Sequence, residues 1–255
     1  MYNELFIFDE KRLFDVFNRL NVYDEINLVW KGNNTIKGLC IASKSGHGSN
    51  LFDKLEPTSY IDFYDKLIKY SIDNSDKLSI YDRGLLYEEL VNLANEFKNG
   101  VESLNNHIKF ELCDYIDYIM YVNIIQTFDG HINEVMLVNY IKSKWYSDAH
   151  KVNGVLDSKY GIDILYRNDT RGIQVKSINF FFGNKSSLIN DRKNLIKLSY
   201  EVKDKFNIDM YYAIYDRMEK KYLLSSNGTP IFSFNEFKEI LENNKKIYKY
   251  KKIYV

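Results

Sequence analysis

The chain has 255 residues, 45% of them hydrophobic and 27% charged, which is enough to bury a core and argues against an intrinsically disordered chain. Its 35 Lys and Arg residues balance 35 Asp and Glu residues, so it lacks the excess of positive charge that is usual in nucleic-acid binders. The two cysteines form no C-x-x-C pair, and neither a signal peptide nor an apolar membrane span is predicted, so we expect a cytoplasmic protein without a disulfide framework.

The first half of the chain, residues 1–128, is predicted to be mainly helical. Apolar side chains recur at helical spacing in four stretches, which are residues 13–20, 57–72, 85–100 and 110–125. The third of these helices is predicted to end at Asn99 and Gly100, because Gly commonly follows the last turn of a helix. Two short apolar runs, 26–30 and 36–41, predict a pair of strands, and a polar loop at 43–50 follows them.

The second half, residues 129–255, begins at an expected boundary near residues 128–130. Residues 131–145 predict a helix whose apolar stripe contains one acid, Glu134. An acid in the first turn either complements the helix dipole or serves as a functional carboxylate. Residues 145–158 are predicted to be a loop.

Residues 160–177 are predicted to form a β-hairpin, because two runs rich in Ile, Leu, Tyr and Val flank a polar segment at 167–172. With an even-numbered loop centred on Asp169 and Thr170, Asp163 lies directly opposite Lys176. Residues that face each other across a hairpin point to the same side, so Asp163, Gln174 and Lys176 converge on one face. Such groups are costly to desolvate on apolar strands, which suggests a site. The apolar residues expected on the opposite face, in a core, are Ile162, Ile164, Ile173 and Val175.

Beyond the hairpin, a polar loop at 177–187 precedes a predicted helix that Ser186 or Ser187 could cap. Strands are then predicted at 210–215, 221–224 and 231–234, and a helix from residue 235. The tail at 245–252 alternates basic and apolar residues, as an edge strand protected by Lys does.

The hairpin sequences Gly161-Ile162-Asp163 and Gln174-Val175-Lys176 resemble the motif of the PD-(D/E)XK nuclease superfamily, which includes most type II restriction endonucleases. In that family an acid at the start of one strand is followed, on the paired strand, by Asp, Glu or sometimes Gln, then any residue, then Lys. The resemblance covers residues 130–226, with Glu134 as the acid of the preceding helix. No Pro precedes Asp163, and Gln174 removes one negative charge from the usual motif.

The resemblance implies an α/β (α+β) fold, with a restriction-endonuclease-like core in which helices flank a mixed central sheet. It also implies Mg²⁺-dependent hydrolysis of double-stranded DNA by a type II restriction endonuclease. The implied catalytic residues are Asp163, Gln174, Lys176 and Glu134. The implied metal ligands are Asp163, the carbonyl of Val175 and Glu134, and with Gln174 in place of an acid we expect one tightly bound ion.

A stand-alone nuclease of this kind is expected to be a homodimer on a palindromic target, with residues 1–128 carrying recognition and dimerisation. The candidate DNA-binding residues are Lys44, Ser45, His47, Asn50, Asn179, Lys185 and Ser186. The loop at 43–50 is better explained as a solvated connector than as a DNA contact, and the basic tail is either an edge strand or an arm that contacts the DNA backbone.

Two alternatives remain open from the sequence. A nuclease of the same fold could serve repair, phage replication or defence, possibly on RNA, and sequence-specific double-strand cleavage would separate it from a restriction enzyme. A non-catalytic binding module would use Asp163 and Lys176 only as a cross-strand ion pair, and it would not bind Mg²⁺.

Overall fold

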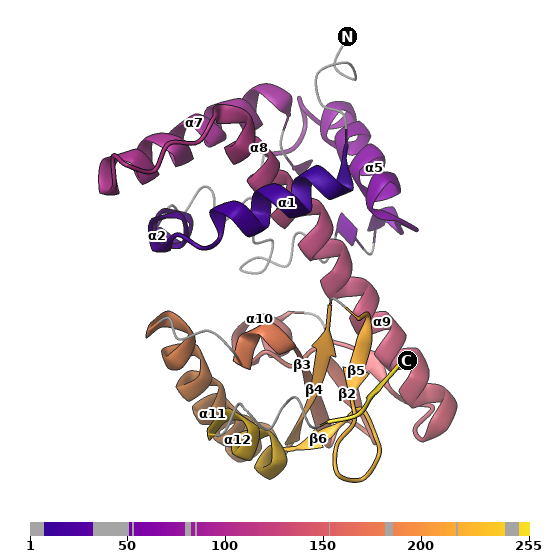
Figure 1. The fold of residues 1–255 in the computed structure, drawn as a ribbon. Coiled ribbons are helices and arrows are strands. Elements are labelled where there is room, and N and C mark those ends of the chain that lie inside the picture. The colour runs from indigo at the N-terminus through magenta and orange to yellow at the C-terminus, as the bar shows by residue number, and fades with distance from the viewer. Residues whose placement is uncertain are drawn as a thin grey trace. The chain divides into compact units, whose positions relative to one another are not determined.

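The computed structural model describes residues 8–32, 51–52, 54–79, 83–84, 86–152, 154–181, 186–217, 219–242 and 250–255. The chain divides into two compact units, Met1–His131 and Ile132–Val255 (Figure 1). The division falls within helix α9, Thr127–Lys144, so the boundary expected at residues 128–130 lies inside a helix. None of the described helices is both long enough and apolar enough to cross a membrane.

The described part of the first unit is helical. Its principal elements are α1 (Glu10–Leu20), α2 (Asp24–Gly32), α5 (Tyr60–Asp73), α7 (Tyr87–Leu104) and α8 (Leu112–Met120), and a π-helical turn, Tyr121–Gln126, joins α8 to α9. The predicted end of a helix at Gly100 was wrong, because α7 continues to Leu104. The strand predicted at 36–41 and the loop at 43–50 lie outside the described residues.

The strand predicted at 26–30 is instead helix α2. Ile26 and Trp30, four residues apart, are both buried, whereas Leu28 between them is 62% exposed. A strand would have placed all three side chains on one face. Asp24 and Glu25 lie in the first turn, where acidic side chains are favoured by the helix dipole.

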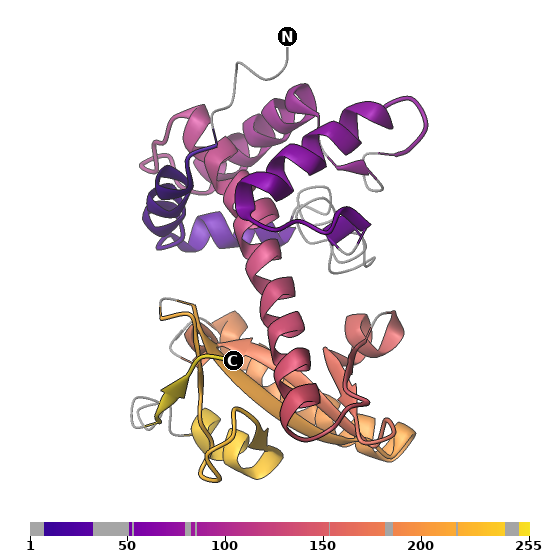
Figure 2. The same cartoon turned by 90° about the vertical axis from the view of Figure 1, so that its right-hand side faces the viewer.

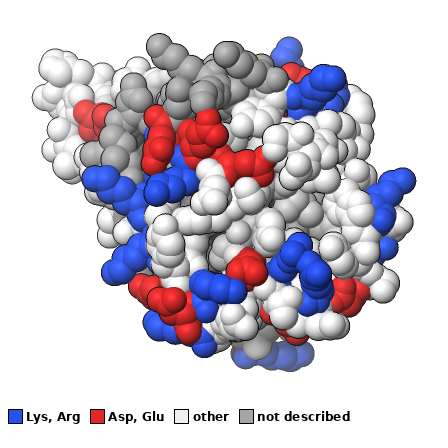
Figure 3. Space-filling model, turned by 90° about the horizontal axis from the view of Figure 1, so that it is seen from below, with Lys and Arg blue, Asp and Glu red and all other residues white. Residues whose placement is uncertain are grey.

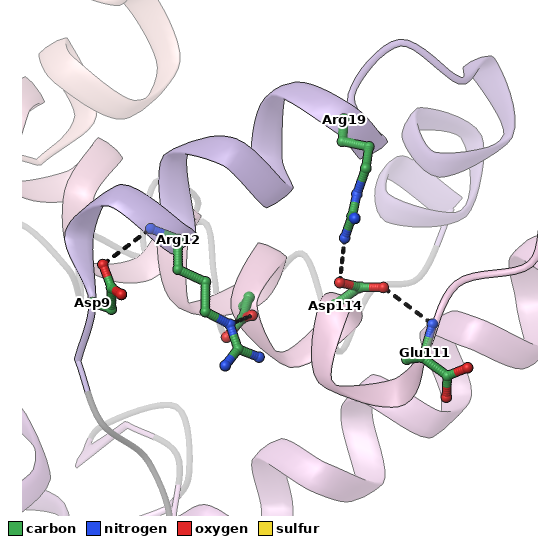
Figure 4. A network of polar contacts seen from close by, with 6 residues as sticks. Asp9, Arg12, Arg19, Glu111 and Asp114 are labelled. Atoms are coloured by element: carbon green, nitrogen blue, oxygen red, sulfur yellow. Dashed lines mark hydrogen bonds and ion pairs between the residues drawn. The ribbon is translucent and has the colours of Figure 1, made fainter.

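Helix α1 packs on α8 through an apolar stripe and through paired charges (Figure 4). Leu13, Val16 and Leu20 are buried. The guanidinium group of Arg12 donates to the buried carboxylate of Asp117 at 2.6 Å, and that of Arg19 donates to Asp114. These two arginines therefore serve the packing of the first unit.

The second unit is a mixed sheet between helices. Its strands are β1 (His150–Lys151), β2 (Ile164–Tyr166), β3 (Arg171–Ser177), β4 (Asp209–Asp216), β5 (Lys221–Leu223), β6 (Phe232–Ser233) and β7 (Lys252–Ile253). In the described residues the order is β1-β2-β3-β4-β5-β7, with β6 also paired to β4. Only the β3–β4 pair is parallel among these described pairs. The mixed α/β class expected from the sequence is confirmed.

Helices cover both faces of this sheet (Figures 1 and 2). On one face, Leu137, Val138 and Ile141 of α9 pack in a core with residues of β2, β3, β4 and β5. On the other face, α11 (Ser186–Phe206) and α12 (Phe234–Glu242) bury their apolar sides against β4 and its neighbours. The sheet therefore positions its polar residues between two layers of helices.

Two elements of this unit were not expected. Residues predicted as a loop at 145–158 contain strand β1 and the start of helix α10, Val155–Tyr160. The described end of the basic tail forms the edge strand β7, as one of the two interpretations predicted, and Lys252 there donates to Asp216 and Glu219, at 2.6 Å in both cases. Lys252 is thus held by acids of the same unit.

Candidate functional site: a charged cluster at the start of strand β2

The hairpin forms, but its register differs from the expected one. Ile164 pairs with Ile173 and Tyr166 pairs with Arg171, so the four-residue turn is centred on Asn168 and Asp169. This register places Asp163 opposite Gln174 rather than opposite Lys176. Because the shift preserves the alternation of side chains, Gln174 and Lys176 still share one face of β3.

Asp163 lies just before β2, and its carboxylate continues the hydrogen-bonding of the hairpin. Its Oδ2 accepts from the backbone N–H of Val175 at 2.6 Å. In a β-strand the N–H and the carbonyl of one residue point to the same edge, so the Val175 carbonyl is directed to this side as well. Asp163 and two backbone groups of β3 thus meet at the start of β2.

The expectation that Ile162 shares a face with Ile164 was wrong. Ile162 packs in the core beneath α11 and α12, whereas Ile164 packs in the core beneath α9. The strand alternation begins only at Ile164, and residues 161–163 form an irregular entry to β2. This irregular entry brings Asp163 to the edge of β3.

Gln174 is the most unusual member of the group. It is 6% exposed, and its Oε1 is a buried acceptor without a hydrogen-bond partner. An unpaired buried acceptor costs about 1–3 kcal/mol, so such an atom calls for an explanation. The Nε2 end of the carboxamide packs against Gly161, where a Cβ atom would lie 2.1 Å from it.

Gly161 is in turn fixed by the end of helix α10. It has a left-handed φ of 65° and donates its N–H to the carbonyl of Asp157 at 2.8 Å, as a glycine that ends a helix does. A side chain at residue 161 would displace the Gln174 amide. The sequence Tyr160-Gly161 therefore sets the position of Gln174 as well as the turn into Asp163.

Lys176 is partly buried on the same face of β3 as Gln174, with its Nζ 5.7 Å from the centre of the Phe180 ring. Burial lowers the pKa of Lys176, and the nearby carboxylates of Asp163, Asp191, Glu134 and Asp157 only partly offset this effect. Its amine is therefore closer to deprotonation than that of an ordinary lysine.

Glu134 lies in the first half of α9, which covers the face of the sheet opposite to α11 and α12. It forms an ion pair with Lys151 of β1, at 3.3 Å between Oε2 and Nζ, and the two side chains are only 21% and 16% exposed. The hydroxyl of Tyr222 on β5 donates to the carbonyl of Asn133 at 2.9 Å and so anchors the turn of α9 that carries Glu134.

Lys151 and Asp157 belong to the cluster but were missed by the sequence interpretation. Both lie in the stretch that was predicted to be a loop, so no strand or helix periodicity marked them. Asp157 is partly buried in the first turn of α10, and burial raises its pKa while Lys151 and Lys176 lower it. A charged residue close before a motif acid is the only signal that the sequence offers.

In this cluster the effect of burial on the two carboxylates outweighs the effect of the nearby lysines. Burial, followed by the charge of Asp163, raises the pKa of Glu134. Burial also raises the pKa of Asp163, against the opposing effects of Lys176 and the Val175 N–H. Carboxylates whose pKa rises although lysines lie nearby would be stabilised in their charged form by an added cation.

The donor set fits one hard divalent cation. Among the described residues no three His, Cys, Asp or Glu side chains are grouped as metal ligands. A cation here would therefore be held by the Asp163 carboxylate, the buried Gln174 Oε1 and the Val175 carbonyl, all oxygen donors of the kind that Mg²⁺ prefers.

The candidate DNA-binding residues were not brought to this site by any described contact. Lys44, Ser45, His47, Asn50 and Lys185 lie outside the described residues, and the side chains of Asn179 and Ser186 are also not described. On the face of the molecule drawn in Figure 3, basic and acidic side chains are intermixed rather than grouped by sign. Comparison with known proteins adds no assignment: no family model, no curated protein and no solved structure matches the chain.

Proposed function

We propose that the chain is a Mg²⁺-dependent nuclease of the PD-(D/E)XK type, which hydrolyses phosphodiester bonds in duplex DNA. The observation that carries the proposal is the buried, unpartnered Oε1 of Gln174, which lies across the hairpin from Asp163 and on the same face of β3 as Lys176. The order of elements supports it: helix α9, hairpin β2–β3, helix α11 and the parallel strand β4.

Each residue of the site has a defined task in this proposal. Asp163, Gln174 and the Val175 carbonyl would hold the cation, which would supply positive charge against the negative charge that develops on the phosphate. Lys176 orients the attacking water and eases its deprotonation, because its lowered pKa allows the amine to accept a proton. The Val175 N–H fixes one carboxylate oxygen of Asp163 and leaves the other for the cation.

The pKa directions favour this role over a purely structural ion pair. In a stabilising pair the acid's pKa falls and the lysine's pKa rises. Here burial raises the pKa of Asp163 and lowers that of Lys176. Keeping these two groups charged in the folded protein is therefore energetically unfavourable, which is typical of functional sites rather than of ordinary cross-strand pairs.

We further propose that the enzyme is a type II restriction endonuclease that acts as a homodimer, with recognition carried by the first unit. A two-fold symmetric dimer matches the symmetry of a palindromic duplex. Cleavage of duplex DNA at a defined sequence would support this assignment, and cleavage of RNA or of DNA without sequence preference would place the same site in another nuclease role.

Digestion of a plasmid with and without Mg²⁺ tests the proposal. We expect wild-type protein to cut only with Mg²⁺, Asp163→Ala to be inactive, and Lys176→Ala to cut about 10²–10⁴-fold more slowly. Asp204→Ala and Lys205→Ala, on the exposed side of α11, remove the same kinds of charge and should leave cutting unchanged. Full activity of both site variants would remove the assignment.

A further inference from the structure

The ion pair between Lys151 and Glu134 is the feature of the cluster that the proposed reaction does not use. Lys151 comes from the edge strand β1 and Glu134 from helix α9, so the pair joins two successive elements of the chain across the turn between them. Their charged atoms are 3.3 Å apart, and both side chains are more than three-quarters buried. A buried pair of this kind is costly to separate, because either partner alone would be an uncompensated charge.

The net charge of the cluster indicates how many divalent cations it can hold. The cluster holds four carboxylates, those of Glu134, Asp157, Asp163 and Asp191, and two ammonium groups, those of Lys151 and Lys176. One divalent cation would make the cluster neutral, whereas two would leave two positive charges in a partly buried place. The Coulomb cost of the second ion is therefore high before any phosphate arrives.

We propose that Lys151 acts as a built-in replacement for a second metal ion: its ammonium group occupies the cation-binding side of Glu134 and limits the site to one divalent ion. This inference rests on the proposed function. The first ion is assigned to Asp163, Gln174 and Val175, on the evidence of the unpartnered Gln174 Oε1. Glu134 is the carboxylate of α9 whose charge interacts with that of Asp163, and Lys151 already pairs with it.

Counting bound Mn²⁺ by isothermal titration calorimetry tests the inference without any activity measurement. We expect one Mn²⁺ per wild-type chain and two per chain in Lys151→Met, which keeps the length of the side chain but not its charge. The double variant Glu134→Gln/Lys151→Met should return to one ion, because the released carboxylate is gone. Lys144→Met, an exposed lysine on the same helix as Glu134, should bind one ion like wild type.

The outcomes separate the inference from the function on which it rests. Absence of Mn²⁺ binding to the folded wild-type protein would overturn the proposed cation site itself. Two ions on wild-type protein, or one ion on a folded Lys151→Met variant, would overturn the role of Lys151 while leaving the nuclease proposal intact. Lys151→Gln, which keeps a polar end to the side chain, replaces the Met variant in the same titration if circular dichroism shows that the Met variant is unfolded.

Discussion

At the scale of single residues, the site depends on two positions that carry no charge. Gln174 provides a buried oxygen without a partner, and Gly161 provides the space in which its carboxamide lies. The charged residues Asp163 and Lys176 are positioned by the strand, but the amide is positioned by the absence of a side chain at residue 161. Two substitutions test these roles separately.

Gly161→Ala is expected to be more harmful than the same change at Gly228. Both glycines have a left-handed φ, of 65° and 71°, so each change costs about 1–2 kcal/mol of backbone strain. At Gly228 the new methyl group meets nothing within 4 Å, whereas at Gly161 it lies 2.1 Å from the Gln174 amide. Thermal unfolding and Mn²⁺ titration should show a larger loss of stability, and roughly tenfold weaker binding, only for Gly161→Ala. Equal effects of the two changes would contradict the close packing of Gln174 on residue 161.

Gln174→Glu is expected to lower stability in a pH-dependent way. The new carboxylate lies opposite Asp163, and burial together with this neighbour raises its folded-state pKa. The loss is therefore small at acidic pH, where the group is protonated, and grows as the pH rises above the ordinary pKa of Glu. We expect about 3 kcal/mol at pH 8 without metal, largely recovered with Mg²⁺. Urea unfolding at pH 5 and pH 8 measures it, and the same loss at both values would count against the account.

At the scale of elements, the hairpin could be predicted and its register could not. Asp163, Gln174 and Lys176 could be recognised as candidate site residues, because they are polar residues on otherwise apolar strands. The turn, however, contains three successive non-glycine residues with left-handed φ, Arg167, Asn168 and Asp169. Such a turn has no reliable sequence signature, so the loop was centred one residue too late.

The local sequence pattern also could not distinguish a strand from a helix at positions where tertiary packing determines the secondary structure. The apolar run at 26–30 was equally compatible with both periods, and burial of Ile26 and Trp30 decided for α2. Strand β1 and helix α10 are too short to show a period at all. For that reason Lys151 and Asp157, which complete the site, could not be found from the sequence.

An element-scale prediction concerns the start of α7. Arg83 donates to both carboxylate oxygens of Glu89, at 2.7 and 2.9 Å, and this pairing lowers the pKa of Glu89. A lowered pKa means that the pair contributes stability above the ordinary pKa of Glu and loses it as the pH falls through the folded-state pKa. Arg83→Met should therefore cost about 1.5–3 kcal/mol at pH 7 and much less near pH 3. Chemical unfolding across this range measures the difference, and a pH-independent difference would refute the pairing.

At the scale of the whole molecule, all members of the site belong to the second unit, while the first unit is helical and pairs its α1 arginines internally. This separation places chemistry and recognition in different parts of the chain under the proposed function. Because a cation that binds only the folded protein stabilises it, Mg²⁺ is expected to raise the free energy of unfolding by about 2.7 kcal/mol at a concentration one hundred times its Kd.

The most direct measurement compares Asp163→Asn and Lys176→Met for two properties at once, Mg²⁺-induced thermal stabilisation and Mg²⁺-dependent cutting of duplex DNA. The account predicts that Asp163→Asn loses both, because it removes the charged ligand, and that Lys176→Met keeps the stabilisation but loses the cutting. Retained stabilisation and cutting in Asp163→Asn, or undiminished cutting in Lys176→Met, would contradict it.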